Sequence, residues 1–330
     1  MMLDSILSKM KPRQRIENDP HRALRAELEH LKKNPHLHNR LPQPAMTSVT
    51  EQAYCQRYAA EIYSGRGEIV ELGCWLGSLT SSLAKGLKTN DRISDTRRRI
   101  TVMDYFKWDV VMEDWVKGTR FAGRVPDGGD FQKLYREAIT DILDMVDISQ
   151  ADLGERGWED GPIEFLLIDC MKRIDVASNV AHSFFPKLIP GASYLAHQDY
   201  LHFFHSWIHI LMYRLRNSIQ PVLTVPGSST VVFKCVRRLR RRHCKFPRSF
   251  EDISPEEIDA AFDWNFEFLD EDLHDAIAAA KVSAFVHKGD MDHAQTLYQD
   301  YIEKLYADSI HFERMRDFFK RFEIVSLGNK

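Results

Sequence analysis

Residues 68–84 read EIVELGCWLGSLTSSLA, and this stretch decides the fold. Its first part, 68–72, has the composition of a buried strand, and Gly73 and Gly77 mark a tight turn that opens a helix at Ser78. Glycines in such a turn let a ligand approach the backbone, because no Cβ stands in the way. The spacing departs from both GxGxxG and GxxxxGK[ST], and the missing lysine argues against an ATPase.

On either side of this stretch, short apolar or β-branched runs alternate with helical patterns. This alternation is typical of a parallel sheet covered on both faces. The expected strands are 68–72, 100–104, 145–148, 164–169 and 193–197, followed by a hairpin of 221–225 and 229–235. The expected helices are 46–64, 78–87, 131–143, 176–188 and 203–216. The sequence therefore predicts an α/β fold with five parallel strands and a terminal antiparallel hairpin.

The two ends of the chain differ in character from this middle part. We expect three parts: an N-terminal arm at 1–45, a folded domain at 46–236, and a charged linker with a helical C-terminal extension at 237–330. The arm is polar and rich in proline, with one helical pattern at 22–33. The extension shows two helical patterns, 273–287 and 292–306, separated by a short turn that suggests a helical hairpin.

Composition limits the class of protein. The chain has 330 residues, enough for a large core without disulfides or structural metals. Hydrophobic residues make up 44% and charged residues 28%, which excludes a disordered, collagen-like or coiled-coil chain. With 45 basic and 48 acidic side chains the net charge is −3, so we expect no globally basic nucleic-acid binder. Five scattered cysteines without a CxxC pair indicate reduced thiols.

Two further expectations concern location and charge. No apolar run approaches the ~18 residues of a membrane span, and the first residues lack a signal core, so we expect a cytoplasmic protein. Association into a homo-oligomer stays open. Residues 235–248 hold seven Arg or Lys and no acid, whereas 251–275 hold eleven Asp or Glu and no base. The basic run can bind an anion, or the acidic run can neutralise it.

The stretch 71–80, ELGCWLGSLT, resembles motif I of class I S-adenosylmethionine (SAM) dependent methyltransferases, in particular small-molecule O-methyltransferases of the macrocin type. The resemblance extends over about residues 50–236 and implies a Rossmann-like sheet. In that family the glycine turn contacts the amino-acid part of SAM, an acid after the second strand binds the ribose hydroxyls, and residues after the third strand hold the adenine. The cofactor-binding residues implied are Glu71, Gly73, Trp75, Gly77, Ser78, Asp104, Tyr105, Gln150, Ala151, Asp152 and Asp169.

Residues 162–200 resemble a second block of the same family, in which a strand ends in an IDG-type sequence and a later strand ends in DDY. In the magnesium-dependent members, an Asp after the first of these strands and the acidic pair after the second bind the metal. Here the pair falls within His197-Gln198-Asp199, and its register stays open by one residue. The resemblance implies Asp169, Gln198 and Asp199 as metal ligands. Whether Mg²⁺ binds stays open, because Met171 stands where the motif has a second acid.

Several residues near these strand ends are candidates for removing a proton from the acceptor. Lys172 resembles the lysine of the D-x-x-K motif in catechol O-methyltransferases, which takes the hydroxyl proton, but it needs a lowered pKa to do so near pH 7. Without a metal, His197 or a carboxylate such as Asp199 is the preferred base. His202 and His205 are rival candidates in the same region.

The resemblance implies a SAM-dependent methyltransferase that methylates an oxygen of a sugar or other hydroxylated small molecule by in-line transfer. The substrate pocket is expected between the arm before residue 50, an insert at 105–130 rich in aromatic residues, and the segment after Asp199. A non-catalytic protein of the same fold, serving as a scaffold, is the alternative. The hypothesis of a nucleic-acid methyltransferase is supported only by the basic run, and the sequence lacks an NPPY-like motif.

Overall fold

The computed structural model describes residues 20–39 and 41–321. The part of the predicted arm that falls on residues 1–19 and on residue 40 therefore lies outside the described residues, as does the end of the predicted extension at 322–330.

Seven strands in this part of the chain form one sheet in the order β3-β2-β1-β4-β5-β7-β6. The strands are β1 Glu68–Leu72, β2 Ile100–Asp104, β3 Val146–Gln150, β4 Ile163–Ile168, β5 Tyr194–His197, β6 Ile219–Thr224 and β7 Val231–Cys235. Strands β1 to β5 are parallel, and β7 is antiparallel to both β5 and β6. The predicted fold class, with five parallel strands and a terminal hairpin, is confirmed.

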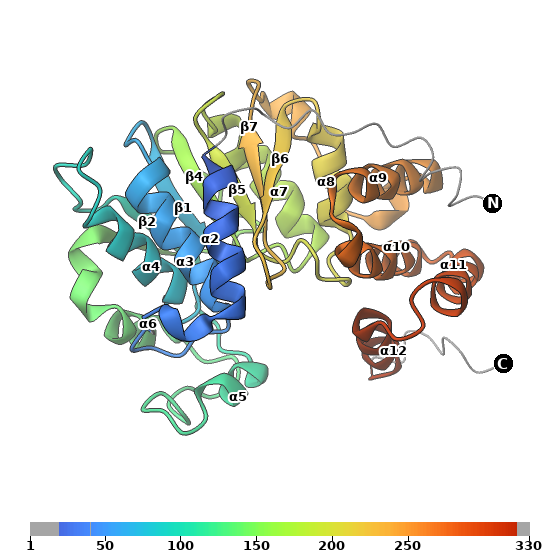
Figure 1. Cartoon of the computed structure of the whole chain (residues 1–330), viewed down its shortest axis with the longest axis horizontal. Helices are drawn as coiled ribbons and strands as arrows, with labels where there is room; N and C mark the ends of the chain where they lie inside the picture. The colour runs from blue at the N-terminus through green and yellow to red at the C-terminus, as the bar shows by residue number, and fades with distance from the viewer. Residues whose placement is uncertain (1–19, 40, 322–330) are drawn as a thin grey trace.

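Helices cover both faces of the sheet (Figure 1). They are α2 His21–Lys33, α3 Val49–Arg57, α4 Ser78–Leu87, α5 Glu113–Val116, α6 Gln132–Ala138, α7 Ile174–Phe184, α8 Trp207–Leu215, α9 Pro255–Phe268, α10 His274–Lys288, α11 Met291–Lys304 and α12 Ile310–Arg321. A π-helical turn, Tyr58–Ile62, follows α3. None of the helices in the described ranges is long and apolar enough to cross a membrane.

Alternation along the strands builds two cores, one on each face of the sheet. Ile69 and Val70 are neighbours in β1 and both are fully buried, but they belong to different apolar clusters. The Ile69 cluster contains α2, α3, α4 and α6, whereas the Val70 cluster contains α7 and α8. Successive side chains of a strand point to opposite faces, so this pattern gives three layers. The helix α2, predicted as part of an arm, buries Leu28 in the first of these cores.

The extension shares the second core. Apolar side chains of α9 to α12, such as Ile258, Ile277 and Phe312, belong to the same cluster as Val70. The acidic run, predicted as a linker, forms α9, which Ser254 caps by accepting a hydrogen bond from Glu257 N–H. Figure 1 shows α9 and α10 beside α8, with α11 and α12 farther out. The extension is thus packed against the sheet domain through a common core.

The acidic and basic runs do not neutralise each other. Arg214 pairs with Glu257, and Lys281 pairs with Asp259 at 2.8 Å. Arg237, Arg238, Arg240 to Arg242, Lys245 and Arg248 are all exposed, and none has an acidic partner within 4 Å in the described ranges. The run begins after Cys235, which pairs with Ile219 at the end of the sheet opposite to the glycine turn. The basic run therefore starts far from the carboxyl ends of the parallel strands.

Several predicted boundaries shift in the structure. The helix predicted at 203–216 begins only at Trp207, because residues 198–206 form turns after β5. The helix predicted at 131–143 divides into α6 and a 3-10 segment, Thr140–Met145. The strand predicted at 145–148 runs on to Gln150 and pairs there with Asp104.

A buried carboxylate joins β4 to the loop before β1. Glu164 is 2% exposed and accepts hydrogen bonds from Ser64 N–H at 2.6 Å, Ser64 Oγ at 2.8 Å, Arg66 N–H at 2.5 Å and Gly67 N–H at 3.2 Å. These bonds hold the start of the central strand.

Replacing Glu164 with alanine leaves those donors without their acceptor. We expect Glu164→Ala to lower the free energy of unfolding by roughly 2–4 kcal/mol, because each buried donor left unsatisfied costs about 1–3 kcal/mol. Denaturant titration followed by circular dichroism measures this loss. Glu159→Ala, on an exposed residue, is the control. Equal stability of the two variants would contradict the expectation.

Candidate functional site

The glycine turn joins the loops that follow the two central strands. Gly73 has φ +85°, and a Cβ built on it would lie 2.6 Å from the carbonyl oxygen of Asp169. Gly77 has φ +77°, and its Cβ would lie 2.5 Å from the side chain of Ile139. Both conformations are ones that side chains rarely adopt. The strand order changes direction between β1 and β4, which is where ligands bind in open α/β sheets.

Two other predicted residues of this turn differ in their surroundings. Trp75 has φ +43°, and its indole N–H is buried without a hydrogen-bond partner in the described part of the chain. Ser78 Oγ lies 3.0 Å from Thr47 Oγ1, and Gln43 Nε2 donates to Gly77 O at 3.0 Å. The segment before residue 50 therefore contacts the turn.

Glu71 lies beneath the turn. It is 1% exposed, and Thr80 Oγ1 donates to its carboxyl group at 2.6 Å. Burial raises the pKa of Glu71 to about 8, although the Thr80 bond opposes the rise, and the charges of Asp104 and Asp169 add to it. The structure thus places Glu71 behind the turn, where it joins β1 to α4, and not at the open edge.

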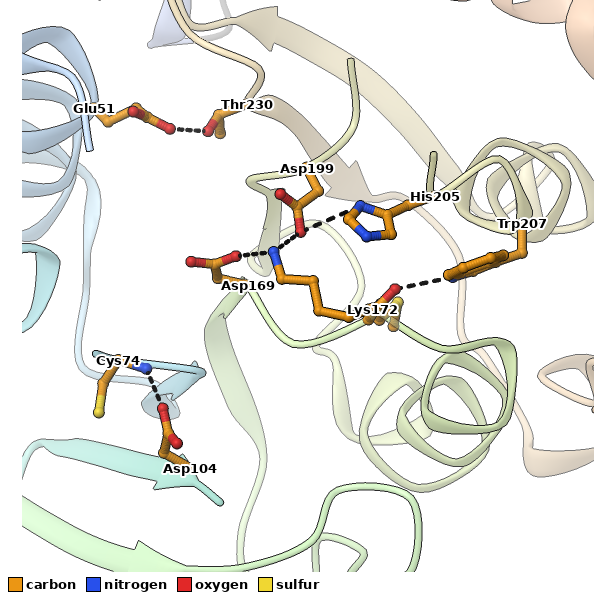
Figure 2. Close-up of polar contacts among 10 residues, drawn as sticks. Glu51, Cys74, Asp104, Asp169, Lys172, Asp199, His205, Trp207 and Thr230 are labelled. Atoms are coloured by element: carbon orange, nitrogen blue, oxygen red, sulfur yellow. Dashed lines mark hydrogen bonds and ion pairs between the residues drawn. The ribbon is translucent and has the colours of Figure 1, made fainter. Parts of the chain in front are cut away.

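Asp104 reaches the turn from the end of β2. Its Oδ2 accepts a hydrogen bond from Cys74 N–H at 2.8 Å, as Figure 2 shows, and its Oδ1 accepts one from Phe106 N–H at 2.6 Å. The adjacent Tyr105 is 55% exposed. Two backbone donors therefore fix the carboxylate at the edge of the sheet, next to Gly73.

The residues predicted after the third strand lie beside Asp104. Ala151 N–H donates to Asp104 O at 2.8 Å. Gln150 Nε2 donates to Asp130 Oδ2 at 2.7 Å and so ties β3 to the insert at 105–130. Asp152 is half-buried and accepts a hydrogen bond from Gly154 N–H. The structure brings these three residues to the same edge of the sheet. The carboxylate of Asp152 is already engaged in the hydrogen bond from Gly154 N–H.

The insert at 105–130 contributes less aromatic surface than predicted. Trp108 and Phe121 are 3% and 1% exposed and pack into the core. Trp115, in α5, is 54% exposed, and Val110 and Val111 are each 64% exposed. Of these three aromatic residues of the insert, only Trp115 therefore has an exposed side chain.

A charged triad of Asp169, Lys172 and Asp199 forms where β4 and β5 end. Lys172 Nζ donates to Asp169 Oδ1 at 2.7 Å and also to Asp199 Oδ2 (Figure 2). His205 Nδ1 lies 3.7 Å from the same Asp199 oxygen. Trp207 Nε1 donates to Met171 O at 2.9 Å and so fixes the loop that carries Lys172. Of the residues in the register left open by the sequence, Asp199 is the one that shares Lys172 with Asp169.

The triad shifts the pKa values of its members. Burial alone would raise the pKa of Asp199, but Lys172 and then His205 lower it to about 2. Burial raises the pKa of Asp169 to about 7, with Lys172 opposing and Asp199 adding to the rise. Burial would lower the pKa of Lys172, yet the two carboxylates raise it above its ordinary value. Lys172 therefore carries a proton near pH 7, which argues against the predicted role as proton acceptor.

His197 is not part of this triad. It is fully buried, and neither ring nitrogen has a hydrogen-bond partner in the described ranges. The rings of Phe185, Tyr200 and Phe233 surround it. Burial lowers its pKa to about 3, so it stays neutral. This placement argues against the predicted role of His197 as base, because its side chain faces the core.

The residues predicted to bind Mg²⁺ do not fit a metal. No group of three or more His, Cys, Asp or Glu side chains in the described ranges is arranged to hold an ion. Asp169 and Asp199 face each other, but the ammonium group of Lys172 lies between them. Gln198 follows β5, where its N–H donates to Ile168 O, and Met171 is buried and offers only a thioether.

Sequence reasoning missed a third carboxyl group, that of Glu51, near the triad. Glu51 forms a capping box with Ser48 at the start of α3, and it accepts a hydrogen bond from Thr230 Oγ1 at 2.6 Å (Figure 2). Thr50 Oγ1 donates to Pro226 O at 2.7 Å. These bonds tie α3 to the β6–β7 hairpin. The S-x-x-E pattern before an apolar run was the available signal for the cap, although not for the tie.

Comparisons with known proteins give similarities of low identity. The O-methyltransferase NovP is 14% identical, with 66% of this chain and 100% of NovP covered and a TM-score of 0.46. CalS11, a calicheamicin methyltransferase, is 16% identical, with 66% and 94% covered and a TM-score of 0.42. An O-methyltransferase from Bacillus cereus is 13% identical, with 71% and 96% covered and a TM-score of 0.35. No family model and no curated protein matches the chain.

The raised pKa of Glu71 predicts a pH-dependent stability. Between about pH 4.5 and 8 the folded carboxyl keeps a proton that the unfolded chain releases, so the free energy of unfolding falls as the pH rises. Glu71→Gln cannot release this proton. We expect it to be more stable than the wild type by roughly 2–5 kcal/mol at pH 8, with a difference that shrinks toward pH 5. Denaturant titrations across this range measure it.

The control for Glu71→Gln is Glu159→Gln, at an exposed position. It should track the wild type at every pH. A Glu71→Gln difference that stays constant from pH 5 to pH 8 would show that the carboxyl is already ionised in the folded protein.

Proposed function

We propose that the chain is a SAM-dependent methyltransferase that methylates an oxygen of a small hydroxylated acceptor, such as a sugar. The observation that carries the proposal is the meeting of Gly73, Asp104 and Asp169 at the point where the strand order reverses. The glycine lets the loops after β1 and β4 approach each other closely, and the acids supply acceptors on two sides of the turn.

The residues of this edge fit the parts of SAM. Each oxygen of Asp104 accepts a hydrogen bond from one backbone N–H and keeps a further lone pair. The carboxylate can therefore also accept hydrogen bonds from both hydroxyls of a ribose. The turn at Gly73 would hold the amino-acid part, and the indole N–H of Trp75, buried without a partner among the described residues, is a donor in the same turn. In this proposal the adenine is held by Gln150, Ala151 and Asp152, and the Ala151 N–H bond to Asp104 O keeps these residues beside the ribose-binding acid.

When bound, SAM supplies a methyl group already activated by its sulfonium charge. The chain must then align the acceptor oxygen and receive its proton. Lys172 is protonated and His197 is enclosed, so we assign the proton to the carboxylates of Asp169 and Asp199, and His202 and His205 stay the rival acceptors. The pKa of Asp169, raised to about 7, suits an exchange of protons near neutral pH.

The position of the basic run does not favour a nucleic-acid acceptor. The run starts after Cys235, at the amino end of the parallel strands, whereas Asp104 and Asp169 lie beyond their carboxyl ends. A duplex held by Arg237 and its neighbours would therefore not lie along the edge that carries the triad. We accordingly propose a small acceptor.

Cofactor binding tests the proposal. Isothermal titration of the protein with SAM and with its demethylated product, S-adenosylhomocysteine (SAH), should show binding of both. We expect Asp104→Asn to weaken binding by about 10-fold to 100-fold, because a hydrogen bond to a charged group contributes about 1.5–3 kcal/mol. Asp141→Asn, on an exposed aspartate before β3, is the matched control and should leave the affinity unchanged.

Two outcomes would contradict the proposal. One is the absence of any heat with SAM or SAH from protein whose circular dichroism shows a folded chain. The other is equal affinity of Asp104→Asn and wild type. Binding without methyl transfer to any member of a panel of hydroxylated metabolites would favour the scaffold alternative.

A further inference from the structure

We infer that the ammonium group of Lys172 takes the place of a divalent cation between Asp169 and Asp199, so that the site excludes a metal and works without one. The exclusion of metal rests on the geometry of the triad alone. Its catalytic meaning deepens the proposed function and rests on it.

The position of Lys172 is set by its backbone. Strands β4 and β5 are parallel neighbours, with Ile168 paired to His197, so the loops after them leave the sheet side by side. Lys172 lies in the first of these loops, where its N–H donates to Cys170 O at 2.8 Å. The bond from Trp207 to Met171 O holds the same turn from the other side. The ammonium group is thus directed to the gap between the two strand ends.

The oxygens that face each other across this gap are already used. Lys172 Nζ donates to Asp169 Oδ1 at 2.7 Å and to Asp199 Oδ2. A magnesium ion needs direct contact with carboxylate oxygens at about 2.0–2.1 Å, and it would meet the positive charge of the ammonium at that point. His205 Nδ1, the other nitrogen near Asp199, lies farther from the carboxylate, at 3.7 Å. Lys172 is therefore the cation of this site.

The donor set offers one hard oxygen ligand fewer than the resembling motif, so a metal here would depend on the two carboxylates and on water. Met171 occupies the position where the resembling motif has a second acid, and it is 1% exposed. Only two carboxylates remain, and no third His, Cys, Asp or Glu in the described ranges completes a group around them. Replacing an acid by a methionine removes a hard oxygen ligand, and adding a lysine supplies the missing positive charge from within the chain.

An ammonium group can perform the electrostatic part of a metal's task. Lysine has three donors, and two are engaged with the carboxylates, so the third can donate to the acceptor oxygen. As that oxygen forms its bond to the methyl carbon, the carbon–sulfur bond breaks and its electron pair stays on sulfur. The hydroxyl proton passes to a carboxylate oxygen of Asp169 or Asp199 and then to water. Lys172 holds the oxygen in place and stabilises the negative charge that develops on it.

Metal binding by purified full-length protein tests the exclusion directly. Mn²⁺, a paramagnetic substitute for Mg²⁺, is titrated and the free ion is measured by electron paramagnetic resonance. We expect Lys172→Ala to bind Mn²⁺ at least about tenfold more tightly than the wild type, because the two carboxylates become free. Lys172→Arg keeps the positive charge and should behave as the wild type. Lys133→Ala, on an exposed lysine of α6, is the matched control.

Equal Mn²⁺ affinity of wild type and Lys172→Ala, whether tight or absent, would overturn the inference. Circular dichroism melts show whether each variant folds, and Lys172→Met serves in place of Lys172→Ala if the shorter side chain unfolds the loop.

The catalytic part has separate readouts. We expect EDTA to leave methyl transfer by the wild type unchanged, and Lys172→Ala to lower kcat by about 100-fold while SAH affinity changes less than about threefold. Loss of wild-type activity in EDTA would overturn the inference. Failure of SAM and SAH to bind would refute the proposed function instead, and the Mn²⁺ titration would still decide whether Lys172 excludes a metal.

Discussion

The close approach of two backbones at the centre of the sheet is the constraint on which the rest of the site depends. Leu72 pairs with Ile168, so the loops after β1 and β4 leave the sheet together, and Asp169 N–H donates to Leu72 O at 2.8 Å. Gly73 N–H donates to Met103 O in β2 at 2.9 Å. Three strand ends are therefore joined by backbone bonds, and no side chain fits at residue 73. The acids that follow these strands take their positions from this rigid junction.

Negative charge gathers at this junction, and the structure limits it in two ways. Glu71 lies within the core with a pKa raised to about 8, so it is neutral at pH 7 and only accepts and donates hydrogen bonds. Lys172 neutralises part of the charge of Asp169 and Asp199. The Asp104 carboxyl group lies beside the glycine turn and is held by two backbone donors. A net negative edge of this kind is complementary to a ligand that carries positive charge.

Much of the fold could be predicted from local pattern. Strand and helix bounds around the glycine turn match because glycines and periodicity mark them, as in β1 and α4. The direction of side chains at 197–199 could not be predicted, since it depends on the pairing of β5 with β7. Likewise the sequence does not show that Lys172 pairs with two carboxylates, because the pairing of β4 with β5 brings Asp169 and Asp199 together. The high content of acidic residues led to a linker being predicted in place of α9, although Ile258, Ala261 and Phe262 have helical spacing.

The part of the chain outside the resemblance to known methyltransferases also shapes the site. Tyr200, next to Asp199, donates its hydroxyl to Asn265 Oδ1 in α9 at 2.5 Å. His287 in α10 donates through Nε2 to Phe204 O at 3.0 Å, beside His205. These bonds come from the extension and fix both ends of the turns that follow β5. Because the Lys172 contact requires Asp199 at a fixed distance from Asp169, the extension is a structural support of the triad and not an independent appendage.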